Sequence, residues 1–106
     1  MDDKCVLQKI TAIASRILPK RSKLILFGSR ARGSARKESD WDLLIVVDND
    51  KLSYETRAEL TYPFVTLGWE IGTDINPVIY TAKKWMAQHF TPFYHNVVKD
   101  GIQLWG

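Results

Sequence analysis

The chain has a single cysteine, Cys5, so it can form no internal disulfide and offers no second thiolate for a structural zinc site. We expect Cys5 to pack within the first helix. No apolar run approaches the ~20 residues that cross a bilayer, and the opening Asp2-Asp3-Lys4 lacks the apolar core of a signal peptide. These absences predict a cytoplasmic protein that does not interact with membranes.

The length bounds the number of domains. A chain of 106 residues can bury one core but is too short for a second catalytic or specificity domain, so we expect a single domain over residues 1–106. Hydrophobic residues make up 45% and charged residues 25%, which is typical of a globular protein. The sequence contains no internal repeat and no low-complexity segment.

Positive charge is concentrated rather than large. The formal net charge is +3, yet seven of the fifteen basic residues lie between Lys20 and Lys37. A focused positive field raises the local concentration of an anionic ligand, so we expect this segment to surround a phosphate site. The alternatives are a solvated basic loop or a nucleic-acid patch.

Hydrophobic spacing and turn residues predict alternating helices and strands. Pro63 is expected to kink or interrupt its helix, and Pro77 confines its strand to an edge or a bulge. This order predicts an α/β (α+β) fold, a small mixed β-sheet with packed helices. Helices are expected over residues 2–18, briefly after Ser29, and over 53–69, 81–86 and 91–100; strands are expected over 23–27, 43–47, 73–80 and 102–105.

The stretch from residue 24 to 47 carries the most specific pattern: a Gly28-Ser29 pair, ten residues, then Asp40-Trp41-Asp42. Alternation along a strand points Asp40 and Asp42 to the same face and Trp41 to the opposite one. Two carboxylates so close repel by roughly 4 kcal/mol at an effective dielectric of about 20, and a divalent cation reverses that cost. Mg²⁺ is the natural ion, since one or two carboxylates plus substrate phosphates usually hold it. Gly28 permits close approach of a ligand, and the amides after Ser29 favour phosphate.

The segments Gly28-Ser29-Arg30-Ala31-Arg32-Gly33 and Ser39-Asp40-Trp41-Asp42-Leu43-Leu44-Ile45-Val46 resemble the nucleotidyltransferase domain of the polymerase β superfamily. They resemble in particular the minimal nucleotidyltransferases, the antitoxin halves of HEPN/minimal-nucleotidyltransferase toxin–antitoxin pairs. The resemblance covers most of the chain and implies the polymerase β-like nucleotidyltransferase fold. Trp41 departs from the family, in which a smaller aliphatic residue is commoner.

The resemblance also implies roles for individual residues. A two-metal Mg²⁺ site would use Asp40 and Asp42 on the ion that grips the triphosphate, and a third carboxylate from the adjacent strand. Asp74 matches that third carboxylate by position, and would complete a second metal position and help deprotonate the attacking hydroxyl. The alternative for Asp74 is an aspartate of a helix-to-strand turn.

Further residues are assigned to the nucleotide. Arg30 and Arg32 are two apart on a tight turn, so we expect one on the phosphates and the other elsewhere. Ser39 either orients a carboxylate or caps the turn. His89 and His95, six apart, do not have the spacing of a helical metal pair and are expected at the surface. The nucleotide-binding set is therefore Gly28, Ser29, Arg30, Arg32 and Ser39.

Together the residues and the resemblance predict a Mg²⁺-dependent nucleotidyltransferase that moves AMP from ATP to a hydroxyl. In the family the acceptor is a tyrosine of the cognate HEPN toxin, which makes that toxin the expected partner and nucleic acid an unexpected one. One alternative is a non-catalytic antitoxin that neutralises its partner by complex formation. Another is a transferase acting on a small molecule or an RNA end.

The chain has more aromatic residues than so small a core needs, so we expect some of them in an exposed patch for a partner. The candidates are Tyr62, Trp69, Tyr80, Trp85, Phe90, Phe93, Tyr94 and Trp105.

Overall fold

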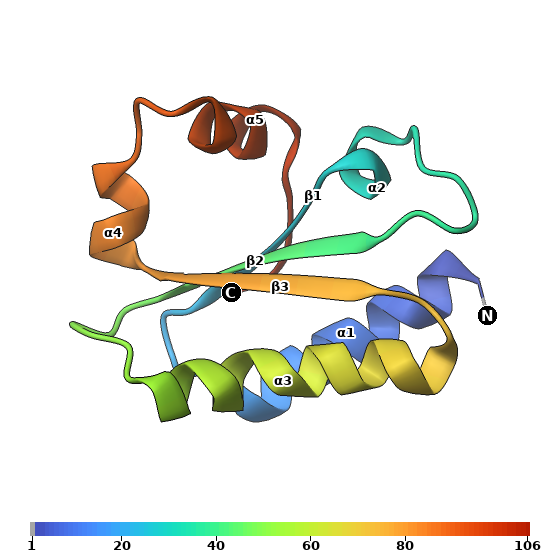
Figure 1. Cartoon of the computed structure of the whole chain (residues 1–106), viewed down its shortest axis with the longest axis horizontal. Helices are drawn as coiled ribbons and strands as arrows, with labels where there is room; N and C mark the ends of the chain where they lie inside the picture. The colour runs from blue at the N-terminus through green and yellow to red at the C-terminus, as the bar shows by residue number, and fades with distance from the viewer. Residues whose placement is uncertain (1) are drawn as a thin grey trace.

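A computed structural model describes residues 2–106 as one four-stranded sheet with helices on both faces (Figure 1). Within these residues no helix combines the length and the apolar character that crossing a membrane requires. The elements are α1 (Asp3–Ile17), β1 (Lys23–Phe27), α2 (Ser29–Arg32), β2 (Trp41–Val47), α3 (Tyr54–Ile71), β3 (Ile75–Thr81), α4 (Ala82–Ala87), α5 (Pro92–Asp100) and β4 (Ile102–Trp105).

The strand order is β3-β2-β1-β4, with β2 antiparallel to β1 and parallel to β3, and β4 antiparallel to β1. The predicted mixed sheet is therefore confirmed. Pro77 lies in the edge strand β3, as expected, because an edge strand can leave the missing amide donor on its unpaired side.

Alternation along β2 divides the core in two. Leu43 and Ile45 are fully buried against α1 and α3, whereas Leu44 and Val46 face α4 and α5. Figure 1 shows α1 and α3 on one side of the sheet and α4 and α5 on the other. Asp42 projects from the same face as Leu44 but lies at the opposite end of β2 from α4, and it is half-buried.

The helix α3 runs without a break across Pro63, so the predicted interruption there is wrong. Leu60, Phe64 and Leu67 on α3 are buried against the sheet, and this packing outweighs the hydrogen bond that the proline removes. Ser53 caps the helix start by accepting the Thr56 amide at 3.1 Å. Packing against the sheet thus keeps α3, the connection between β2 and β3, a single continuous helix.

Cys5 lies in the first helix, as expected, but the expectation that it packs there is wrong, because Cys5 is exposed in the first turn of α1. Its amide donates to Asp2 Oδ1 at 2.8 Å, so Asp2 is the N-cap of the helix. The Asp2 carboxylate raises the pKa of the Cys5 thiol through a hydrogen bond and through its negative charge.

Candidate functional site

The turn at Gly28 lies directly against the Asp42 carboxylate. Phe27 pairs with Asp42 across β1 and β2, and Gly28 follows with φ 78° and ψ −159°, a conformation essentially restricted to glycine. A Cβ added to Gly28 would meet Asp42 Oδ2 at 2.5 Å. The amides of Ala31 and Arg32 both donate to the Gly28 carbonyl at 3.1 Å, and these bonds form the first turn of the short helix α2. The turn and the acidic strand therefore touch, as the sequence pattern predicts.

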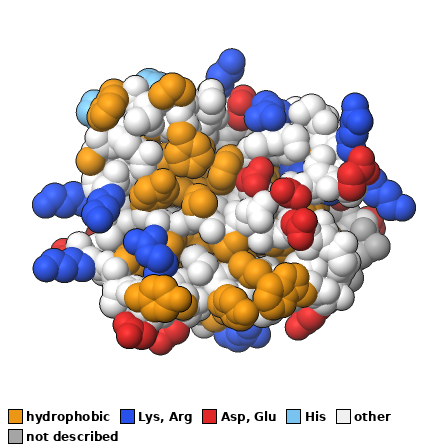
Figure 2. All heavy atoms as spheres, viewed as in Figure 1, with side chains coloured by type: hydrophobic (Ala, Val, Ile, Leu, Met, Phe, Trp, Pro, Cys, Tyr) orange, Lys and Arg blue, Asp and Glu red, His pale blue; other side chains and the backbone are white. Residues whose placement is uncertain are grey.

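The acidic pair lies where β2 begins. Asp40 is exposed immediately before the strand, and Asp42 is half-buried at its second position. Between them Trp41 is only 2% exposed and belongs to the opposite core, which confirms its predicted orientation. In Figure 2 acidic side chains gather on this face over the N-terminal ends of β2 and β3. Several carboxylates therefore lie close together at this end of the sheet.

Asn76 is a site residue that the sequence analysis missed. It pairs with Asp42 in the parallel β2–β3 register, and its Nδ2 donates to Asp40 Oδ2 at 3.0 Å. Its side chain is therefore on the same face as the acidic pair. An asparagine followed by a proline carries no local signal of this kind; only the strand register could have indicated it.

Asp74 lies one residue before β3 and is exposed. Its carbonyl accepts the Trp41 amide at 2.9 Å, which places its backbone beside the start of β2. It also lines a hollow of about 380 Å³ with Lys37, Trp69 and Gly72. The roles predicted for Asp74 remain predictions.

The chemistry of these donors suits a hard divalent cation. Asp40 and Asp42 supply charged oxygens, and Asn76 adds an amide oxygen beside them. Within residues 2–106 no group of three His, Cys, Asp or Glu side chains forms a set that could hold a metal by itself. Mg²⁺ is usually shared between one or two carboxylates and the phosphates of its substrate, so Asp40 and Asp42 could hold it together with a nucleotide.

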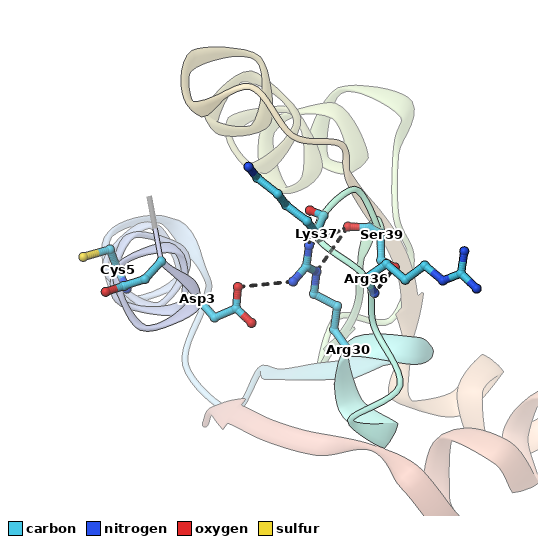
Figure 3. A network of polar contacts seen from close by, with 7 residues as sticks. Asp3, Cys5, Arg30, Arg36, Lys37 and Ser39 are labelled. Atoms are coloured by element: carbon cyan, nitrogen blue, oxygen red, sulfur yellow. Dashed lines mark hydrogen bonds and ion pairs between the residues drawn. The ribbon is translucent and has the colours of Figure 1, made fainter.

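The side chain of Arg30 is buried, only 7% exposed, and it contacts the loop that joins α2 to β2 (Figure 3). Nε and Nη2 donate to the Ser39 carbonyl at 3.1 and 2.9 Å, and Nη2 also donates to the Lys37 carbonyl at 3.1 Å. Nη1 pairs with Asp3 Oδ1 at 3.2 Å, which joins the loop to the start of α1. These contacts of the Arg30 guanidinium therefore stabilise the fold.

Arg32, by contrast, is exposed, and within residues 2–106 it makes no side-chain hydrogen bond or ion pair. Arg30 and Arg32 therefore lie in different surroundings, and the expectation that one of them binds phosphate stays a prediction. Ser39 Oγ accepts the Arg36 amide at 2.8 Å, so this hydroxyl stabilises the turn of the loop. Of these candidates Arg32 is therefore the one available to bind phosphate.

The basic residues between Lys20 and Lys37 lie at two opposite ends of β1. The expectation that all of them surround the site is therefore wrong. Lys23 pairs with Val46 and Phe27 pairs with Asp42, which places the two ends of β1 about 13 Å apart at 3.3 Å per residue. Lys20, Arg21 and Lys23 lie at the far end, and Arg21 pairs there with Asp48 at 3.5 Å. Only the basic residues from Arg30 to Lys37 belong to the site region.

His89 and His95 are exposed, as expected. They lie outside the site, near α4 and in α5.

Comparison with known proteins gives a consistent family relationship. The model of the family described as "Nucleotidyltransferase domain" matches residues 7–85. A protein of Methanocaldococcus jannaschii, provisionally named a protein adenylyltransferase, is 30% identical over 107 aligned residues, covering 98% of each chain.

Solved structures show the same fold. A toxin–antitoxin with AMP-PNP is 26% identical, with a TM-score of 0.63 over 94% of this chain and 73% of that one. A mutant of the toxin–antitoxin MntA–HpeT is 28% identical, with a TM-score of 0.63 over 93% of this chain and 71% of that one. A complex of tri-AMPylated HEPN toxin with MNT antitoxin from Shewanella oneidensis is 24% identical, with a TM-score of 0.60 over 97% and 71%.

Proposed function

The chain belongs to the nucleotidyltransferase domain family, and on that premise we propose that it transfers AMP from ATP to a hydroxyl group in a Mg²⁺-dependent reaction. The observation that carries the proposal is the contact between the Gly28 turn and Asp42, since it brings a phosphate-binding turn against a metal-binding carboxylate. A 26% identical neighbour with AMP-PNP supports a nucleotide substrate. The M. jannaschii relative supports adenylyl transfer.

In the proposed reaction the acceptor oxygen attacks the α-phosphorus in line with the leaving group. A new O–P bond forms, the bond from that phosphorus to the bridging oxygen breaks, and pyrophosphate leaves. Asp40 and Asp42 would hold Mg²⁺, which when bound neutralises charge on the triphosphate. The Gly28-Ser29 turn and Arg32 bind the phosphates, and the proton of the acceptor passes to Asp74, an exposed residue that lines the same hollow as Trp69.

We assign the acceptor to a tyrosine of a HEPN toxin that forms a complex with this chain. The support is the family resemblance together with the two toxin–antitoxin structures at 26% and 28% identity. The double variant Asp40→Asn with Asp42→Asn, incubated with labelled ATP and the toxin, should lose at least about 100-fold in transfer, because both charged metal ligands are removed.

Asp50→Asn, in the loop at the far end of β2, is the matched control and should transfer at the wild-type rate. Undiminished transfer by the double variant would reject the proposal. Label that appears on RNA or on a small molecule, and not on the toxin, would reject the tyrosine acceptor.

A second candidate function is neutralisation by binding alone, and the surface of α3 favours it. Tyr54, Tyr62 and Trp69 are 84%, 54% and 65% exposed. Figure 2 shows hydrophobic side chains along this helix. If the double variant protects RNA from the toxin as well as wild type does at equal concentration, binding suffices. If protection requires ATP and both aspartates, transfer is the function.

A further inference from the structure

A second cavity lies at the end of the sheet opposite the acidic pair. Its volume is about 670 Å³, and it is lined by the loop after β2, the last residues of β3, and residues of α3 and α4. Along β2, Asp42 and the last strand residue, Val47, are about 17 Å apart at 3.3 Å per residue. The cavity is therefore separate from the Gly28 turn and the two aspartates.

The position of this cavity follows from the parallel pairing of β2 with β3. Parallel strands end at the same edge of the sheet, and the segments that follow them surround a crevice outside their carboxyl ends. Here Lys51 and Leu52 come from the loop after β2, and Lys83 and Lys84 come from the helix after β3. Crevices of this kind are the usual ligand sites of open α/β sheets.

The cavity is lined by cations that have no carboxylate partner. Among its described lining residues Asp50 is the one carboxylate, so the formal charge of the lining is +3. The ion pairs within residues 2–106 are made by Arg21 and Arg30, which lie outside this cavity. Arg57 Nη1 donates to the Ile79 carbonyl at 3.1 Å, a neutral acceptor that holds the guanidinium at the cavity wall. The four cations are Lys51, Arg57, Lys83 and Lys84.

Charge and shape together indicate the kind of ligand. Like charges that line one cavity repel each other, so an anion between them is stabilised. In Figure 2 Lys and Arg side chains gather at the left of the view, at the end of β3 where α4 begins. Leu52, Ile79 and Tyr80 add apolar surface to the same cavity, and its volume lies within the roughly 300–1,000 Å³ of small-molecule sites. These features match a ligand with several negative charges and an apolar part.

We propose that this cavity binds a polyphosphate ligand of mononucleotide size, independently of a metal ion and of the acidic pair. The phosphates lie among the four cations, and the apolar part of the ligand lies against Leu52 and Tyr80. A single cavity of this volume favours a small ligand over a nucleic-acid strand, which is bound along an extended groove. The proposal does not rest on the proposed function, because it involves neither Mg²⁺ nor the transfer reaction.

The test is a titration of the ¹⁵N-labelled protein with ATP in the presence of EDTA, followed by the NMR shifts of the backbone amides. EDTA keeps divalent cations from the acidic pair. We expect saturable shifts at residues 50–57 and 79–87. Inorganic triphosphate should shift the same amides, and adenosine should bind at least about 10-fold more weakly than ATP, because charge dominates recognition.

The double variant Lys83→Gln with Lys84→Gln should bind ATP about 10-fold more weakly, the effect of losing two exposed charge contacts. The matched control is Lys4→Gln with Lys9→Gln, which removes the same charge from exposed positions of α1 and should bind ATP as wild type does. Dispersed amide signals in each variant check that the substitutions leave the fold intact.

Two results would overturn the inference and leave the proposed function standing. One is a set of shifts confined to residues 28–39, which would place ATP at the Gly28 turn. The other is equal ATP affinity of the Lys83/Lys84 variant and its control. Adenosine binding as tightly as ATP would overturn the role of charge. If a single-stranded RNA of about ten nucleotides shifted the cavity amides and ATP did not, the cavity would belong to a nucleic-acid surface, and the proposed ligand class would be wrong.

Discussion

The guanidinium carbon of Arg30 lies 4.3 Å from the centroid of the Trp41 ring. The tryptophan between the two site aspartates is therefore covered by the arginine of the Gly28 turn, and a cation over an indole ring is stabilised by the ring quadrupole. The same guanidinium bonds the carbonyls of Lys37 and Ser39. One side chain thus couples the Gly28 turn, the loop after it and the strand that carries the acidic pair.

Arg30→Lys should lower the free energy of unfolding by about 2 kcal/mol, the scale of losing hydrogen bonds to a charged donor. A lysine ammonium is a point charge on a flexible stem and cannot span the Lys37 and Ser39 carbonyls with a rigid fork. Trypsin should cleave faster after Arg36, because the loop loosens. The measurements are urea denaturation and limited proteolysis.

The matched control is Arg32→Lys, at an exposed position of the same helix. It should leave stability and proteolysis unchanged and instead weaken nucleotide binding, because bidentate recognition of phosphate is lost. Equal stability of Arg30→Lys and wild type would contradict the structural role of Arg30.

Gly28→Ala should cost roughly 1–3 kcal/mol of stability, because its backbone conformation is nearly exclusive to glycine. The new Cβ would also meet Asp42 Oδ2 at 2.5 Å, so we expect displacement of that carboxylate and a loss of Mg²⁺-dependent ATP binding. Calorimetric titration of the variant with ATP and Mg²⁺ measures the loss.

Gly33→Ala separates the effect of backbone strain from the effect of displacing the Asp42 carboxylate. Gly33 also has positive φ, 77°, but an added Cβ there meets nothing within 4 Å. It should lose about 1–2 kcal/mol from the left-handed backbone and keep nucleotide affinity. If Gly28→Ala bound ATP as tightly as Gly33→Ala, the contact between turn and carboxylate would have no functional importance.

Gly68→Ala should destabilise the protein even though alanine is the better helix former by about 1 kcal/mol. The added Cβ would lie 2.5 Å from the Thr73 carbonyl and 3.1 Å from the Ile75 amide, both backbone atoms that cannot move independently of β3. We expect a net loss of about 1–3 kcal/mol, the usual cost of overpacking, measured by thermal unfolding. A melting temperature at or above that of wild type would show that α3 and β3 separate easily.

The Cys5 thiol should react slowly with iodoacetamide at neutral pH although it is exposed, because Asp2 raises its pKa and so reduces the thiolate fraction. Asp2→Asn removes the negative charge, so the midpoint of the pH–rate profile should shift to lower pH. Asp3→Asn, at the neighbouring carboxylate, serves as the control and should leave the profile in place. Identical profiles for Asp2→Asn and wild type would show that Asp2 does not control the thiol.

Local structure was largely predictable because its causes are local. Ser53, Thr81 and Thr91 each accept the amide three residues ahead, and each begins the helix that its sequence position indicates. The strand β1 has the predicted bounds of residues 23–27. β2 begins two residues earlier than expected, at Trp41, because pairing with β3 and β1 extends a strand that hydrophobicity alone starts at Leu43.

The site was predictable in part. Gly28, Asp40 and Asp42 could be singled out because glycine at a strand end and alternating aspartates are visible in the sequence. The position of Asn76 beside the acidic pair and the burial of the Arg30 side chain could not be predicted, because each depends on partners seven or more residues away in the chain.

The residue pattern by itself determined most of the helices and strands and singled out the glycine turn and the two aspartates, since spacing, capping and backbone preference act over a few residues. The tertiary structure alone decided which β3 side chain lies beside Asp42, which arginine stays exposed, and how the basic residues divide between the two ends of β1. These outcomes follow from strand order and register, which are properties of contacts between distant segments and are written in no single stretch of the chain.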